Sequence, residues 1–139
     1  MESSAQDNET TTLSSCVRGH HIYKDIWDPV VGEKLDCCRE CGNVQDRYAV
    51  AVVRTLVDPK LKRRRHKTET AVTTVGHLPR KISCVCSLFL RRGGTITCEI
   101  TGHRRHSSDL PQGGLEVPCL LIFVGNKADI AKIKSKTNI

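Results

Sequence analysis

The chain has no apolar run that approaches the roughly 20 residues needed to cross a bilayer. Residues 1–14 also lack the basic start and apolar centre of a signal peptide. We therefore expect a soluble, intracellular protein. Its eight cysteines would suggest disulfides in a small secreted protein, but here they lie in apolar segments of a chain with an ordinary core composition. We expect them to be reduced thiols.

Catalytic motifs are missing too. The sequence contains no Gly-rich loop ending in Gly-Lys-Ser/Thr, no Gly-x-Ser-x-Gly elbow and no His-Glu-x-x-His pair. We predict that the chain is not an enzyme. Its 139 residues suffice for one domain with a modest core.

Positive charge exceeds negative charge in this chain, and it is unevenly distributed. The formal net charge is +7, yet residues 1–14 are acidic and rich in Ser and Thr, and we expect them to be disordered. Residues 60–67 and the tail, 126–139, are basic. A basic surface favours polyanions such as nucleic acids, and it equally suits an acidic protein partner.

Hydrophobic periodicity predicts mostly β structure with one clear helix. Apolar residues recur at three- and four-residue spacing over 80–92, after Pro79, which suits the first turn of a helix. A short basic helix is expected at 128–134, and residues 58–70 form a charged insertion at a hairpin tip. Polar residues at 103–114 predict a loop. The expected strands cover residues 15–18, 30–39, 48–56, 71–75, 95–101 and 115–124.

Two motifs carry most of the functional information. The first, ECGNVQDRYAVAVV, spans residues 40–53 and combines a Gly-Asn turn, an acid and a strand that is apolar throughout. Such a strand is covered on both faces. The second motif, Val-Gly-His-Leu-Pro-Arg, spans residues 75–80 and joins a strand to the predicted helix. The motif residues are Glu40, Asn43, Asp46, Ala49, Val50 and Val52, then Val75, Gly76, His77, Leu78 and Pro79.

Together these motifs resemble the HIRAN domain over most of the chain, from about residue 16 to residue 125. The resemblance implies a small β-barrel related to OB and SH3-like folds, with a domain at 15–125. The best-understood HIRAN domains are fused to SWI/SNF-class fork-remodelling translocases and capture single-stranded DNA at a free 3′ end. The resemblance thus implies nucleic-acid binding and a link to DNA repair. The basic run at 62–67 can serve as a nuclear import signal, so we expect a nuclear location. The chain is too short to hold a translocase motor as well.

The resemblance also indicates where nucleic acid would bind. Asp46 would accept a hydrogen bond from a terminal sugar hydroxyl; its alternative role is to close the turn at Asn43. His77 and Arg80 can reach backbone phosphates at a helix start, or can belong to a solvated turn. The predicted nucleic-acid-binding residues are Tyr23, Lys24, Asn43, Asp46, His77, Arg80 and Lys81, together with Arg63, Arg64 and Arg65 in the basic insertion.

The sequence departs from the family where affinity should arise. Gln45 stands where an aromatic ring is expected, and Tyr23-Lys24-Asp25 replaces a tyrosine pair. With five aromatic residues in the chain, only Tyr23, Tyr48 and Trp27 could stack on bases, and Tyr48 is expected in the core. We therefore expect weak binding. The alternative is a protein-interaction module that keeps the fold and has lost the DNA pocket.

A zinc site is the third alternative. Cys38 and Cys41 have the spacing of half a zinc ribbon, but the sequence has no second Cys-x-x-Cys pair. Cys84 and Cys86 have the wrong gap, and Cys86 is expected to face the core. Free cysteines are among the most buried residues, so we predict core filling and no zinc or other cofactor.

Overall fold

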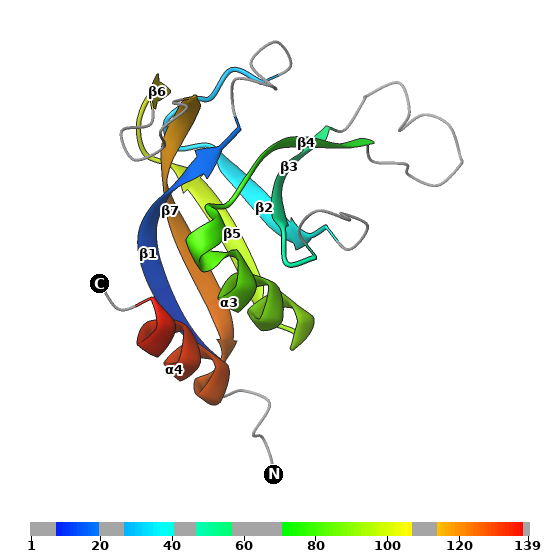
Figure 1. Cartoon of the computed structure of the whole chain (residues 1–139), viewed down its shortest axis with the longest axis vertical. Helices are drawn as coiled ribbons and strands as arrows, with labels where there is room; N and C mark the ends of the chain where they lie inside the picture. Colours follow the sequence, from blue (N-terminus) through cyan, green and yellow to red (C-terminus); the bar gives the residue numbers. More distant parts are fainter. Residues whose placement is uncertain (1–7, 20–26, 41–46, 57–70, 107–113, 138–139) are drawn as a thin grey trace.

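The computed structural model describes residues 8–19, 27–40, 47–56, 71–106 and 114–137. Strands dominate it, and two helices follow β4 and β7 (Figure 1). The strands are β1 (Asn8–Arg18), β2 (Lys34–Arg39), β3 (Val50–Leu56), β4 (Ala71–His77), β5 (Thr95–Ile100), β6 (Arg105–His106) and β7 (Leu115–Asn126). The helices are α3 (Arg80–Arg91) and α4 (Lys127–Lys136).

The sheet closes on itself. Its order is β1-β4-β3-β2-β5-β7-β6, every pairing is antiparallel, and β1 also pairs with β7. The β1–β7 ladder is long and runs from Asn8 opposite Asn126 to Arg18 opposite Glu116. The β1–β4 side has a single pair, Arg18 opposite His77. This arrangement confirms the predicted β-barrel.

The core lies inside the barrel and beneath α3. Residues 49–53 are all buried, which confirms the strand covered on both faces. Helix α3 packs against β2, β3 and β5, as its periodicity predicts. Its Phe89 ring meets Phe123 of β7 edge-on, with ring centroids 5.5 Å apart. The predicted helix at 80–92 is therefore confirmed.

The predicted ends of the domain are wrong. Residues 8–14 are not disordered but form the first part of β1, since pairing with β7 provides the hydrogen bonds that this polar segment could not supply alone. The tail is not outside the domain either: Ile130 and Ile133 of α4 are buried in the core. The domain thus extends from at least Asn8 to α4, and the expected short basic helix is present.

Several local expectations have different outcomes. Pro118 lies inside β7 between the residues that pair with β5 and those that pair with β6, and it is opposite Cys16 of β1. The predicted polar loop contains β6.

Trp27 is not available for stacking, because it is 1% exposed, and Tyr48 is half-buried rather than in the core. The insertion at 58–70 lies outside the described residues. No helix in the described ranges is long and apolar enough to span a membrane.

Candidate nucleic-acid interface

The Val-Gly-His motif lies where the barrel closes. A Cβ atom on Gly76 would lie 2.3 Å from Val17 Cγ1 and 2.8 Å from the backbone oxygen of Arg18. Only glycine lets β4 approach β1 this closely. The motif glycine is therefore required by the closure, and the closure places His77 beside Arg18.

The rest of the motif turns the chain from β4 into α3. Leu78 is buried, and its amide donates to the backbone oxygen of Val50. Pro79 precedes the helix in extended geometry, and no side chain caps the helix start. The sequence therefore brings Arg80 and Lys81, both exposed, to the edge of the barrel.

Part of the first motif meets the second at this point. The Nε2 atom of His77 lies 2.9 Å from Oε1 of Glu40, and both side chains are about one third exposed. Glu40 follows β2 and its amide donates to the backbone oxygen of Ala49. The acidic residue of the motif is thus the hydrogen-bond partner of the motif histidine and orients its ring.

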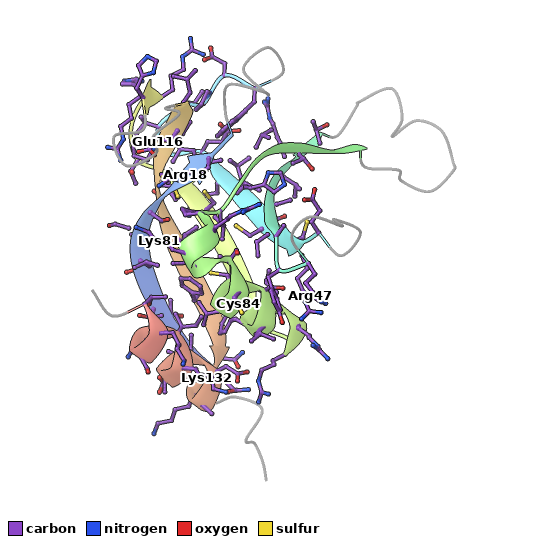
Figure 2. The ribbon with its side chains drawn as sticks, viewed as in Figure 1. Arg18, Arg47, Lys81, Cys84, Glu116 and Lys132 are labelled. Atoms are coloured by element: carbon purple, nitrogen blue, oxygen red, sulfur yellow. The ribbon has the colours of Figure 1, made fainter. Side chains whose placement is uncertain are left out.

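A groove of about 370 Å³ runs between β1 and the start of α3. We call it the β1–α3 groove. Figure 2 shows Arg18, Glu116 and Lys81 along this part of the molecule. The groove is lined by Leu13, Ser14, Ser15, Cys16, Arg18, Pro79, Lys81, Ile82, Arg105 and Glu116. Cations from β1, α3 and β6 therefore meet at one groove, beside two serine hydroxyls.

The carboxylate in this groove is buried and is held by the cations. Glu116 is 5% exposed. Its Oε2 accepts from Nε of Arg105 at 2.9 Å, and its Oε1 lies 3.7 Å from Nη1 of Arg18. Cys16 donates to the same Oε1 at 3.5 Å. Burial is the main cause that raises the pKa of the Cys16 thiol to about 11, and Glu116 adds to it.

Glu116 therefore holds two arginine side chains next to each other. Their positive charges compensate its negative charge, so it does not repel a bound anion. A carboxylate can accept from two guanidinium groups at once, and each guanidinium keeps further N–H donors. The Arg105 side chain is 58% exposed, so it can also reach a bound group. The chemistry suits a phosphate-bearing chain that passes along the groove.

Sequence reasoning predicted only part of this site. His77, Arg80 and Lys81 lie together at the barrel closure, and their predicted role in nucleic-acid binding stays a prediction. Tyr23, Lys24, Asn43, Asp46 and the insertion residues Arg63, Arg64 and Arg65 lie outside the described residues, so their predicted roles stay predictions.

Arg18, Glu116 and the two serines were missed, and Arg105 was noted only as part of a basic loop at 103–106. A lone Glu in the apolar run of residues 115–124 was the one available signal, because a buried carboxylate requires cationic partners.

Aromatic rings contribute little to the described part of the site. Among the residues that the structure describes, none that lines the β1–α3 groove is aromatic. Tyr48 follows the segment that contains Asp46. The guanidinium carbon of Arg47 lies 5.2 Å from the centroid of the Tyr48 ring, a cation–π contact. Weak binding, which was expected from the few aromatic residues of the chain, stays a prediction.

The cysteines mostly fill the core. Cys37, Cys86, Cys98 and Cys119 are buried, and Cys86 faces the core as predicted. Burial raises the pKa of Cys86 to about 12. A hydrogen bond with the Cys98 thiol, together with burial, raises the pKa of the Cys119 thiol. Cys38 is exposed, and Cys41 lies outside the described residues. The described ranges hold no group of three or more potential metal ligands, and the absence of zinc remains a prediction.

Comparison with solved structures defines the class of fold. The chain has the fold of a HIRAN domain. It is similar to the crystal structure of the HIRAN domain of human HLTF, with 13% identity and a TM-score of 0.63, over 94% of this chain and 90% of that one.

The fold is also similar to that of a Lactobacillus plantarum protein, with 16% identity and a TM-score of 0.53, over 86% of this chain and 99% of that one. No family model matches the sequence, and no curated protein matches it.

Proposed function

We propose that this domain binds nucleic acid along the β1–α3 groove, with single-stranded DNA as the ligand. The observation that carries the proposal is the convergence of Arg18, Lys81 and Arg105 on one groove whose carboxylate, Glu116, is buried and already bound. The groove is continuous with the barrel closure, where His77 and Arg80 lie. The HIRAN-type fold supports the proposal by analogy.

Recognition of a free 3′ end is the finer part of the proposal. We assign recognition of the 3′ end to Asp46 and Asn43, because both belong to the motif that resembles the HIRAN domain. A carboxylate that accepts from a terminal hydroxyl would reject a 3′ phosphate, because the phosphate removes the donor and adds negative charge. Asp46→Asn is therefore expected to weaken binding of the hydroxyl end and to narrow the discrimination against phosphate.

Fluorescence anisotropy with labelled oligonucleotides tests both parts. The native protein is titrated with single strands that end in a 3′ hydroxyl or a 3′ phosphate, and with blunt duplex, at several salt concentrations. Lys81→Gln and Arg105→Gln should each lower the salt slope for single strands by about 0.7 per lost phosphate contact. Lys127→Gln, an exposed lysine of α4 outside the groove, is the matched control.

The possible outcomes distinguish nucleic-acid binding at the groove from recognition of a free 3′ end. Equal binding of all three ends, with a salt slope that depends on Lys81 and Arg105, would keep nucleic-acid binding and remove end recognition. An unchanged slope in both variants would remove the groove as the site. A slope that falls only in a triple Ala variant of Arg63, Arg64 and Arg65 would place the phosphate contacts on the insertion.

We further propose that binding is not coupled to catalysis or to zinc, and that the protein is nuclear. The basic run at 62–67 is the candidate import signal. Elemental analysis of the purified protein tests the zinc statement: one equivalent of zinc, lost in Cys38→Ser, would contradict it.

A further inference from the structure

A second groove, of about 730 Å³, lies between α3 and α4. We call it the α3–α4 groove. Figure 2 shows Cys84 of α3 and Lys132 of α4 in this region, with Lys81 between them and Arg18 in that view. Its volume falls in the range of grooves that hold a ligand or a short peptide. The proposed nucleic-acid site uses one of its lining residues, Lys81.

The floor of the groove is apolar and aliphatic. Val85 and Leu88 of α3 and Ile133 of α4 line it, and Leu88 is 40% exposed. Phe89 also lines the groove, but its ring is only 2% exposed and packs on Phe123. An exposed leucine on an apolar floor is a surface that gains from being covered.

The rim of the groove is cationic. Lys81, Arg91, Lys132 and Lys136 line it, and none of them makes an ion pair with any residue that the structure describes. Among the described residues that line the groove, Asp129 is the one acid. Its Oδ1 lies 2.7 Å from Nε of Arg92, so its charge is compensated. The groove therefore presents an apolar floor inside a ring of positive charge.

Contacts at one end hold the two helices in place. Arg92 directly follows α3, and its bond to Asp129 joins that end to the first turn of α4. Asn126 caps α4: its side chain accepts from the Asp129 amide at 2.8 Å and donates to the Asp129 carboxylate at 3.0 Å. A groove fixed in this way is formed before a ligand arrives, which lowers the entropy cost of binding.

We infer that the α3–α4 groove docks a short acidic, amphipathic peptide segment of a partner protein. Aliphatic or aromatic side chains of the peptide would cover Leu88 and its neighbours, and its carboxylates would meet the lysines of the rim. A nucleic acid fits this groove less well than the β1–α3 groove, because the floor formed by the described residues is aliphatic and offers neither donors for phosphates nor an exposed ring for stacking. Apart from Lys81, which lines both grooves, the inference stands on residues other than those that carry the proposed nucleic-acid binding.

Peptide selection provides the test. Phage-displayed random peptides about 12 residues long, a length that spans a helical groove, are selected on the native protein and depleted on Leu88→Glu. We expect the retained sequences to carry net negative charge together with Leu, Ile or Phe at three- and four-residue spacing. A fluorescent synthetic copy of the best sequence is then measured by anisotropy. Leu88→Glu and Lys132→Glu should each weaken it by about tenfold or more, and Lys127→Glu should not.

Two exposed cysteines provide an independent readout of the same site. Cys84 lines the α3–α4 groove and Cys38 of β2 does not. The bound peptide should slow alkylation of Cys84, measured by mass spectrometry, and leave that of Cys38 unchanged. Leu88→Ala, which keeps a good helix former at that position, gives the same comparison should Leu88→Glu fail to fold.

Three results would overturn the inference. The first is a selection that returns no sequences, or sequences without negative charge. The second is a selected peptide that binds Leu88→Glu and Lys132→Glu as tightly as the native protein. The third is a thymidine oligonucleotide that protects Cys84 as well as the peptide does, which would make this groove a nucleic-acid site.

Discussion

The two grooves share Lys81 but differ in how they use charge. In the β1–α3 groove, the arginines are fixed by a buried carboxylate, and the lining mixes polar and apolar residues. In the α3–α4 groove, the lysines of the rim make no ion pair with the described residues, and the floor is aliphatic. Fixed guanidinium groups beside hydroxyls suit phosphates, whereas flexible lysines around an apolar floor suit an acidic peptide. The difference shows that a basic surface alone does not define the partner.

The largest effect is expected from Glu116→Gln, because the carboxylate organises the whole β1–α3 groove. The Arg18 side chain is 17% exposed and would lose its charged partner. Removing one member of a buried ion pair costs about 3 kcal/mol in the free energy of unfolding. Urea denaturation should show this loss, and Glu99→Gln, on the half-exposed face of β5, should change little. Equal stability of the two variants would contradict the role given to Glu116.

A second prediction compares the thiols of the two grooves. Burial raises the pKa of Cys16 from its ordinary value of 9.0 to about 11, so that below pH 9 this thiol is protonated more fully than an ordinary one. The alkylation rate of Cys16 should therefore be about tenfold to a hundredfold below that of an ordinary thiol at pH 8, and should keep rising with pH until about 11. Mass spectrometry after timed alkylation should show Cys84, which is exposed, modified first. Equal rates would mean that the β1–α3 groove opens to solvent.

Gly76→Ala tests the barrel closure on which the β1–α3 groove depends. The added methyl group would meet Val17 and the backbone of Arg18, and such overpacking costs about 1 to 3 kcal/mol. Thermal unfolding should show the loss, while peptide binding at the α3–α4 groove of the folded protein should persist. Gly102→Ala is a milder control, because its nearest contact, Pro118 Cγ, would be 3.1 Å away. No difference between the two variants would indicate that β1 and β4 can separate freely.

The smallest effect is expected from Lys81→Gln, which alters both grooves. One exposed cation contributes about 1 kcal/mol or less to an interaction in water. We expect a few-fold loss in oligonucleotide and in acidic-peptide affinity, with no change in unfolding. Competition between the two ligands, measured by anisotropy, should be weaker in this variant. Loss of only one binding activity would assign Lys81 to a single groove.

Local patterns predicted most of the elements. The three- and four-residue spacing of Ile82, Cys86 and Phe89 identified α3, and the continuous apolar run identified β3 as covered on both faces. These features depend on neighbours in the chain. The start of β1 was missed, because a polar Ser/Thr segment becomes a strand only when another strand pairs with it.

By itself, the sequence determined the β-rich class, α3, the basic surface and the two HIRAN-like motifs, all of which are encoded within short segments. Only the tertiary structure decided that Arg18 lies beside His77, that Glu116 joins arginines from two strands, and that α3 and α4 enclose an aliphatic groove. The physical reason is that each site combines residues distant in the chain, and no local propensity specifies which strands meet when the barrel closes.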